Sequence, residues 1–534
     1  MIYVTATGKF KVCPPYLDRV LYYRRAENVG ESNPMTDTYV LALDIGTSSV
    51  RAILFDSRGD SVKTGQTVLG SQIKYSQTTT FDGGVEVDAE KLLALTVSCL
   101  AKAVVKIKRA KKHVSAVGIS CFWHSLVGVG DEGRAVTPVY SWADTRSAGK
   151  VAELRKLFDD DAYHKISGAE LHPCFWPAKL LWLRSNHTDL YNSVKRWMGF
   201  AEYLFLRLFN DGRSSISMAS GTGLFNQQAA EWDRFIINTL GLEIDTLPVL
   251  SSAGPEKAVV GEYKAALAQF ADIPWFPAVG DGAASNVGSG GSDDRRLVLN
   301  VGTSAAMRVV VPSPKDAALS IKKGLFCYRV DEERVIFGGA FANGGNVYAW
   351  LKDTLLWHDD AAMAAKIARI KPDSHGLTVL PYWAGERSPG WRAGARAAIL
   401  GMNLNTSPED IVRATLESIS YSFNEIRVSL HEQFPLTREI ALSGGAIGSS
   451  PLLGQIICDV FGVPLVTGKV AEASSRGAAL IALKGIGAIS SLTDAPFEKG
   501  KLLRPSKAAH ELYVRAIERF EKYNSSVIEP TSRI

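Results

Sequence analysis

Apolar and polar positions follow a clear pattern from Tyr39 onward, and the pattern opens with two strands. Residues 39–46, YVLALDIG, form an apolar run that holds one carboxylate, and TSSVRAILFD then alternates as far as SRGD. This predicts two strands joined by a tight turn at Gly46, Thr47 and Ser48. The same order returns in the second half as RLVLNVGTSAAMRVVV, with Gly302, Thr303 and Ser304 in the turn. The two copies predict a duplicated architecture.

Helical segments alternate with short strands between and after these units. Residues 89–107 read as a helix and residues 116–122, AVGISCF, as a strand. A second helix begins well at Ser407-Pro408-Glu409-Asp410, with a serine cap, proline in the first turn and acids behind it. Its apolar face is predicted to hold Val412, Leu416, Ile419 and Phe423. Alternating strands and helices predict α/β layers.

Composition limits the size and class of the protein. A chain of 534 residues, 46% of them hydrophobic, is too long for one core, so two large domains are expected. The net charge of +5 is small and no basic block is interleaved with aromatic residues, so we expect no nucleic-acid partner. No apolar run is long enough to cross a bilayer, so we expect no membrane partner. The six cysteines lie far apart, which indicates a reducing compartment and a cytoplasmic location.

The first residues do not share the pattern that follows. Residues 1–37 lack the continuous apolar centre of a secretory signal. They are interpreted either as an N-terminal extension or as the product of an early start codon, with Met35 as the true first residue.

The usual nucleotide motifs do not account for this chain. There is no GxxxxGK[ST] sequence, and the one GxGxxG match, at Gly128, Gly130 and Gly133, is followed by extended, proline-containing sequence. A dinucleotide site requires a helix there. We interpret this match as a hairpin turn around Asp131-Glu132-Gly133.

The two Gly-Thr-Ser turns are the better candidates for binding phosphate. Such turns present backbone N–H groups and hydroxyls without steric obstruction. Asp44 stands directly before the first turn, where a carboxylate suits Mg²⁺, and Arg51 after it could reach phosphate oxygens. A single such triplet is more often only a turn, but the repetition with an acidic lead residue favours a triphosphate site.

Asp281 is the candidate general base. It lies between Gly280 and Gly282 after an apolar stretch, so a substrate can approach it closely. Phosphoryl transfer to an alcohol needs a carboxylate within hydrogen-bond reach of the attacking hydroxyl. An isolated Asp-Gly pair is usually a simple turn, and the two phosphate turns are what favour the catalytic interpretation.

Other residues suit a sugar. Trp123 and His124 at a predicted strand end offer an aromatic wall and a hydrogen-bonding ring, and Trp142, Asp144 and Arg146 form a polar trio nearby in sequence. The Ser443-Gly444-Gly445-Ala446 segment could accommodate adenosine or simply end a strand.

In their order and spacing these segments resemble the FGGY family of carbohydrate kinases, from about Tyr39 to Gly487. The motifs that carry the resemblance are LALDIGTSSVRAILFD, SWADTRS, GDGAASNVG, NVGTS, LPYWAGERSP, ALSGGAIGSSPLLGQIICDVFG and EASSRGAAL. The resemblance implies an actin-like ATPase (ribonuclease H-like) fold, duplicated in two lobes with an interdomain cleft, with ATP and Mg²⁺ as cofactors. The lobes would span residues 38–284 and 285–488, with a C-terminal helical tail over 489–534.

By motif position the resemblance also implies roles for individual residues. Asp281 matches the catalytic base and sugar contact, Asp44 the acid near the metal, and Trp123-His124 a Met-His sugar contact. The ATP-binding positions would be Gly46, Thr47, Ser48, Arg51, Gly302, Thr303, Gly444 and Gly445.

The stretches HSL, WADTRS, SGAELHP and KLLWLR look most like the gluconate kinases of the family, which implies D-gluconate as the acceptor and 6-phosphogluconate as the product. Trp123 in place of Met, Glu202 in place of Asp and Ser215 in place of Asp depart from the usual pattern. A kinase for another pentulose or polyol, resembling the xylulokinases, and an actin-fold ATPase that is not a kinase stay open as alternatives. Many relatives pair, so a homodimer is possible on resemblance alone.

Overall fold

The computed structural model describes residues 38–254, 259–270, 272–355 and 361–528. The predicted N-terminal extension, residues 1–37, and the alternative start at Met35 lie outside these ranges.

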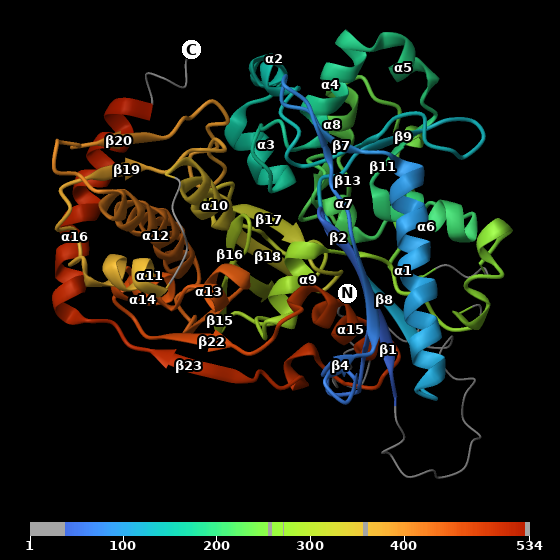
Figure 1. Cartoon of the computed structure of the whole chain (residues 1–534). Coiled ribbons are helices and arrows are strands. Elements are labelled where there is room, and N and C mark those ends of the chain that lie inside the picture. The colour runs from blue at the N-terminus through green and yellow to red at the C-terminus, as the bar shows by residue number, and fades with distance from the viewer. Residues whose placement is uncertain (1–37, 255–258, 271, 356–360, 529–534) are drawn as a thin grey trace, which may run out of the picture. The chain divides into compact units, whose positions relative to one another are not determined.

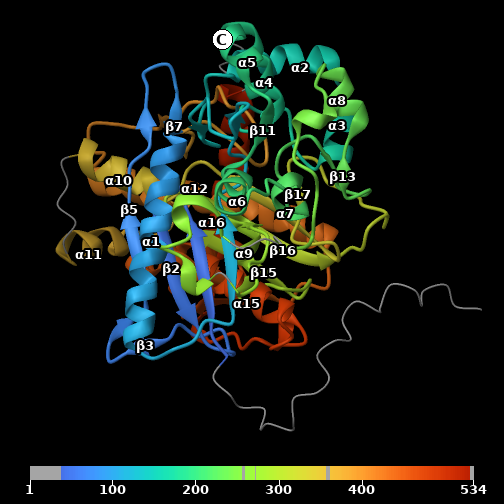
Figure 2. The same cartoon turned by 90° about the vertical axis from the view of Figure 1, so that its right-hand side faces the viewer.

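The first predicted strand pair forms the centre of a five-stranded sheet. β1 pairs antiparallel with β2 and parallel with β8, and all six residues of β1 are buried, Asp44 among them. Helix α1 (Ala89–Arg109) packs along β2 and β5, as Figure 2 shows. Asp88 caps this helix by accepting from the backbone N–H of Lys91. The strand order is β14 (Val279–Gly280), β8 (Ala116–Cys121), β1 (Val40–Ile45), β2 (Ser49–Phe55) and β5 (Gly70–Lys74).

A second sheet repeats this arrangement. β15 pairs antiparallel with β16 and parallel with β21, as β1 does with β2 and β8, and β22 lies parallel beyond β21 as β14 lies beyond β8. The duplicated α/β architecture predicted from the two Gly-Thr-Ser units is therefore confirmed. The strand order is β17 (Phe326–Arg329), β18 (Arg334–Phe341), β16 (Ala305–Pro312), β15 (Arg296–Val301), β21 (Glu439–Ser443), β22 (Leu465–Gly468) and β23 (Lys499–Leu503).

The long helix α12 (Pro408–Gln433) begins as the sequence predicts. Ser407 and Asp410 form a reciprocal capping box with Pro408 in the first turn. The four residues predicted for its apolar face, Val412 to Phe423, are all buried. Helix α16 (Lys507–Tyr523) lies beside α12 and α14 (Pro451–Phe461) (Figure 1). The Tyr513 hydroxyl of α16 donates to Glu417 of α12, so α16 is fixed to α12.

Helices α9 and α15, which come from the two halves of the chain, pack so closely that their backbones are in contact. Helix α15 (Ala473–Gly485) comes late in the chain but packs on α9 (Asp281–Gly288), β8 and β1. A Cβ on Gly477 would lie 1.8 Å from the carbonyl oxygen of Ala284, so only glycine permits this approach. The lobe boundary predicted between residues 284 and 285 thus falls inside α9. Helix α15, within the range predicted for the second lobe, packs in the core of the first sheet.

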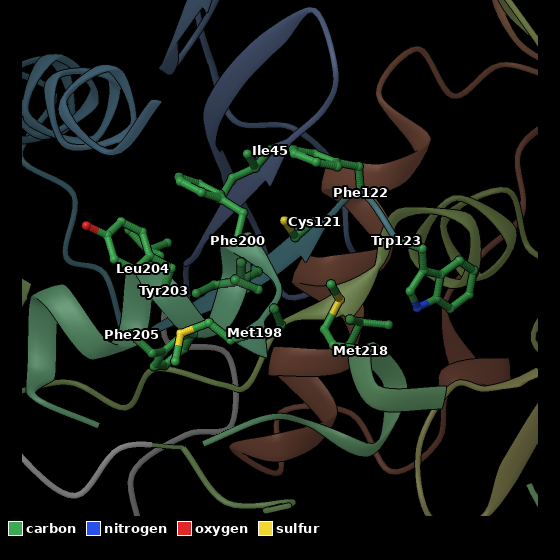
Figure 3. Close-up of a cluster of buried hydrophobic side chains, with 14 of the residues drawn as sticks. Ile45, Cys121, Phe122, Trp123, Met198, Phe200, Tyr203, Leu204, Phe205 and Met218 are labelled. Atoms are coloured by element: carbon green, nitrogen blue, oxygen red, sulfur yellow. The ribbon is translucent and has the colours of Figure 1, made fainter. Parts of the chain in front are cut away.

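An apolar cluster fixes the end of β8, where candidate site residues begin. Figure 3 shows Cys121 and Phe122 directed toward Ile45 and Phe200, while Trp123 lies apart beside Met218. The rings of Phe122 and Phe200 stack with centroids 6.5 Å apart. Phe200 begins helix α6 (Phe200–Phe209), and Met218 belongs to the short helix α7 (Ile216–Ser220). The backbone that carries Trp123 and His124 is therefore held from both sides.

The remaining short elements include the predicted hairpin. Gly130 donates to Arg134 around the Asp131-Glu132-Gly133 turn, so the GxGxxG match is a hairpin and not a dinucleotide site.

In the described part of the chain no helix has the length and apolarity to cross a membrane. There the five cysteines Cys99, Cys121, Cys174, Cys327 and Cys458 are buried and free. The cytoplasmic location stays a prediction.

The other helices are α2 (Val151–Leu157), α3 (Asp160–Ser167), α4 (Trp176–Asn186), α5 (Thr188–Ser193), α8 (Arg234–Thr239), α10 (Gly345–Thr354), α11 (Ala361–Arg369) and α13 (Gly445–Ser449). Short strands accompany them: β3 (Lys63–Thr64), β4 (Thr67–Val68), β6 (Thr78–Thr79), β7 (Val85–Val87), β9 (Val127–Val129), β10 (Val139–Tyr140), β11 (Arg196–Met198), β12 (Phe225–Asn226), β13 (Glu231–Trp232), β19 (Thr378–Leu380) and β20 (Ala398–Leu400).

Candidate active site

Both Gly-Thr-Ser turns contribute to one cavity. The first turn joins β1 to β2 and the second joins β15 to β16, and each is closed by a hydrogen bond from the N–H of its glycine. Thr47 from the first turn and Ser304 from the second line a cavity of about 190 Å³, together with Asp281. The side chains that the sequence places far apart therefore meet at a single concave site.

Asp281 is placed by the junction of β14 and α9. It is the first residue of α9, and its Oδ1 accepts from the N–H of Gly282 at 2.8 Å. Burial raises the pKa of Asp281, the positive charge of Arg308 opposes this rise, and the nearby carboxyl of Asp44 adds to it. A carboxylate that is partly desolvated in this way is a stronger base than one in water.

Trp123 explains why glycines flank Asp281. A Cβ on Gly280 would lie 1.8 Å from Cε2 of the Trp123 indole, and one on Gly282 would lie 2.7 Å from its Cζ3. The ring is anchored by its Nε1–H, which donates to the carbonyl of Ser217 at 2.8 Å, and it packs against Tyr328 with centroids 5.1 Å apart. The indole is thus held in place against the backbone of Gly280 and Gly282, on either side of Asp281.

His124 also lines the cavity, in a defined protonation state. Its Nδ1 pairs with the carbonyl oxygen of Gly221, and since a carbonyl only accepts, Nδ1 carries the proton. Burial holds the pKa of His124 well below its usual value, and the positive charge of Arg387 lowers it further. The neutral ring therefore keeps a lone pair on Nε2 that can accept from a substrate hydroxyl.

Of the predicted trio Trp142, Asp144 and Arg146, only Trp142 lines the cavity. Trp142 lines the cavity with Asp281. Asp144 instead accepts from the N–H of Val85 at 3.1 Å and pairs with Arg146, which also pairs with Glu86. Neither Asp144 nor Arg146 is among the residues that line the cavity. Asp144 and Arg146 thus pair with each other beside the turn that presents Trp142, and their predicted sugar contact stays a prediction.

Asp44 and Arg51 face each other across the first strand pair. Nη1 of Arg51 donates to Oδ2 of Asp44 at 3.1 Å, and its Nε lies 3.3 Å from Oε2 of Glu472. Arg51 lines a separate cavity of about 630 Å³ and does not line the one with Asp281. Arg51 could therefore contact phosphate, as predicted, only if its guanidinium moved away from Asp44 and Glu472.

The oxygen-rich surroundings of Asp44 fit a divalent cation. Burial raises the pKa of Asp44, with Arg51 opposing, and the carboxyl of Asp44 raises the pKa of Asp281. A hard cation near both would relieve that repulsion, and carboxylate and hydroxyl oxygens are the ligands that Mg²⁺ prefers. Asn300 takes the place of Asp44 in the second sheet, where its Nδ2 donates to Ser443 at 3.0 Å. The second turn therefore presents no acid of its own.

The glycine pair Gly444-Gly445 lies beside the second turn. Gly444 has φ of 100°, and a Cβ there would meet the carbonyl oxygen of Val301 at 2.3 Å, so glycine is required. Gly445 begins α13, and a Cβ there would meet nothing within 4 Å. The N–H of Gly345 at the start of α10 donates to the carbonyl of Gly302. The Gly444-Gly445 segment thus lies beside the second turn and outside the lining of the Asp281 cavity, and its predicted role in nucleotide binding stays a prediction.

Sequence reasoning missed several cavity residues. Arg308 on β16, Tyr328 and Phe326 on β17, and Arg387 in the loop after β19 all line the cavity. A signal was present for Arg308, which is the one charge inside the apolar run AAMRVVV. Arg387 lies in the GERSP segment, where the sequence offered no reason to prefer binding to packing.

Comparison with known proteins agrees with this geometry. Residues 39–288 match the N-terminal domain, and residues 297–486 the C-terminal domain, of the FGGY family of carbohydrate kinases. A gluconokinase of Bacillus subtilis is 28% identical over 475 residues, which are 85% of this chain and 89% of that protein. A xylulose kinase of Staphylococcus xylosus is 24% identical over 84% of this chain and 91% of that protein.

Among solved structures, a gluconate kinase from Lactobacillus acidophilus superposes with a TM-score of 0.81 at 26% identity, covering 92% of this chain and 98% of that one. These matches confirm the predicted actin-like ATPase fold in two lobes. The two domains in their order, each with its Gly-Thr-Ser turn, establish that this chain belongs to the FGGY family of carbohydrate kinases.

Proposed function

We propose that this carbohydrate kinase transfers the γ-phosphoryl group of ATP to the terminal hydroxyl of D-gluconate, giving 6-phosphogluconate and ADP. The observation that carries the proposal is the single cavity in which Asp281 meets Thr47 and Ser304 of the two turns. A base and two phosphate-binding turns at one site are the parts that phosphoryl transfer to an alcohol needs.

In the proposed reaction Asp281 accepts the proton of the attacking hydroxyl. The acceptor oxygen forms a bond to the γ-phosphorus while the bond from that phosphorus to the bridging oxygen of ADP breaks. His124 accepts a hydrogen bond from another acceptor hydroxyl through Nε2, and the Trp142 indole packs on the carbon chain. Because little covalent chemistry is required of the protein, positioning and charge stabilisation supply most of the rate.

The turns and the glycine pair hold the nucleotide. Backbone N–H groups at Gly46–Ser48 and Gly302–Thr303 bind phosphate oxygens, and Gly444 and Gly445 leave room for adenosine. Arg51 joins them if its pairs with Asp44 and Glu472 open. FGGY kinases generally use a divalent metal, and we propose Mg²⁺ near Asp44, where it would neutralise charge on the phosphates.

The choice of gluconate is supported by the relatives. Gluconokinases stand among the similar curated proteins and among the similar structures, at 28% and 26% identity. Xylulose kinases match at 24% and 25%, so phosphorylation of a pentulose is the second candidate. The predicted homodimer stays a prediction.

An acceptor panel in an ADP-coupled assay tests the proposal. D-Gluconate, D-xylulose, glycerol and buffer alone are compared at saturating MgATP. We expect D-gluconate to give the highest kcat/KM, by at least about tenfold, since differences of one or two polar contacts are worth roughly 10-fold or more. A higher value for D-xylulose would establish the second candidate instead. ADP release that no acceptor increases would refute kinase activity and favour an ATPase.

A further inference from the structure

Two arginines in the cavity form no ion pair with a carboxylate in the part of the chain that the structure describes. Arg308 on β16 and Arg387 after β19 both line the cavity with Asp281. The Nε atom of each is buried without a hydrogen-bond partner, and neither guanidinium lies within ion-pair distance of a described carboxylate. Both side chains are half-buried, so each Nε is withdrawn from water while the rest of the guanidinium belongs to the cavity lining.

In the described residues, the arginines that are fully buried have hydrogen-bond partners. Arg329 donates to the carbonyls of Gln227 and Ser313, and Arg476 donates to those of Gly59, Gly288 and Pro496. Arg413 pairs with Glu417 inside α12. The fold therefore gives partners to the guanidiniums that it buries fully, whereas the two half-buried arginines of the cavity form no ion pair with a described carboxylate.

The charges of the cavity lining do not balance. Asp281 is its one carboxylate, Arg308 and Arg387 are its two cations, and His124 is held neutral. Burial lowers the pKa of Arg308 to about 10, Asp281 opposes this, and the charge of Arg387 adds to it. The two guanidiniums thus face the same space and repel each other, a cost that an anion between them would remove.

The surroundings of Arg387 favour a carboxylate as the anion that binds between the two arginines. Its guanidinium carbon lies 5.4 Å from the ring centroid of Trp142 and 5.4 Å from that of Trp391. Its charge also acts on His124 and on Tyr328, which belong to the acceptor side of the cavity. The two Gly-Thr-Ser turns, by contrast, join β1 to β2 and β15 to β16. A guanidinium that is packed on aromatic rings keeps its N–H edge free, and this edge matches the two oxygens of a carboxylate.

We propose that Arg308 and Arg387 bind the carboxylate of the acceptor and make this kinase select sugar acids over neutral polyols. This rests on the proposed function, because it assigns the acceptor to the Asp281 cavity. A neutral acceptor would cover both guanidiniums without pairing their charges, so discrimination comes from the cost of binding the wrong substrate.

The test compares D-gluconate with D-glucitol, which has the same carbon chain with a hydroxymethyl group in place of the carboxylate. The proteins are the wild type, Arg387→Gln, Arg308→Gln and the corresponding lysine variants. Each glutamine variant should lower kcat/KM for D-gluconate about 100-fold more than kcat/KM for D-glucitol, the order expected for a charged hydrogen-bonded contact to the carboxylate. Lysine keeps the charge without the planar fork, so part of the preference should return.

The controls separate a carboxylate contact from a phosphate contact and from misfolding. The KM for ATP and the thermal unfolding midpoint should stay at wild-type values in the glutamine variants. Equal losses with both acceptors together with a raised KM for ATP would overturn the inference, because the arginines would then bind phosphate. An unchanged preference for D-gluconate in both glutamine variants would overturn it as well.

Failure of the proposed function would look different. A wild-type enzyme that ignores D-gluconate but phosphorylates another aldonic or uronic acid would refute the proposed substrate and support the carboxylate site. A wild-type enzyme that uses D-glucitol as efficiently as any acid would refute the carboxylate site and leave the kinase assignment intact.

Discussion

Replacing Gly280 by alanine is expected to damage the site through one identifiable contact. The added Cβ would lie 1.8 Å from Cε2 of Trp123, which is 1.6 Å short of the 3.4 Å at which ordinary contact begins. The indole cannot swing away freely, since its N–H is bonded to Ser217 and its edge packs against Tyr328. The strand end must therefore move and carry Asp281 with it.

The size of the effect follows from this displacement. Overpacking a core position costs about 1–3 kcal/mol, and a shift of about 1 Å in a reacting group costs roughly 100-fold in rate. Gly280→Ala should accordingly lower both the free energy of unfolding and kcat. Steady-state kinetics and thermal unfolding measure the two effects on the same samples.

Two further variants make the reasoning refutable. Gly149→Ala is the matched control, because a Cβ there meets nothing within 4 Å and the residue is not in the site. In a Trp123→Met background the clash partner is gone, so Gly280→Ala should cost clearly less than in the wild type. Wild-type activity and stability for Gly280→Ala, or an equal cost in both backgrounds, would refute the contact as the cause.

Three other outcomes are expected. The pKa of Asp281 is raised by burial above 3.8, and the base must be ionised, so kcat/KM for the acceptor should fall as the pH drops through a value above 3.8; an acid limb at or below 3.8 would contradict this. Gly477→Ala should lower the unfolding midpoint, since its Cβ would meet the Ala284 carbonyl oxygen at 1.8 Å; an unchanged midpoint would mean that α9 and α15 separate easily. Removal of divalent cations with EDTA should abolish phosphoryl transfer and added Mg²⁺ should restore it; full activity in EDTA would exclude the proposed ion.

Local features of this protein could be predicted from its sequence. The strand–turn–strand units depend on short apolar runs and on Gly-Thr-Ser triplets, and the start of α12 depends on Ser407, Pro408 and Asp410 alone. Each of these is decided within a few residues by backbone conformation and capping, so the sequence carries the whole signal.

Contacts between residues that are far apart in the sequence could not be predicted in the same way. Arg308 and Arg387 meet in one cavity because of how β16 and the loop after β19 are arranged, and nothing near either residue indicates the other. Glu86 from β7 likewise forms a charge cluster with Asp144 and Arg146, and nothing near these two residues in the sequence indicates it. The docking of α15 on the first sheet likewise depends on Gly477 meeting Ala284, a contact between two halves of the chain.

The role of Asp281 can be measured most directly with Asp281→Asn, which keeps the size of the side chain and removes the base. ATP affinity by titration calorimetry and single-turnover transfer to D-gluconate are compared with the wild type. The account predicts an unchanged Kd for ATP and a loss of transfer of roughly 10²–10⁴-fold, the range that a general base contributes. Transfer that stays above about a tenth of the wild-type rate would contradict it, since a base that contributes so little is not the one that the reaction uses.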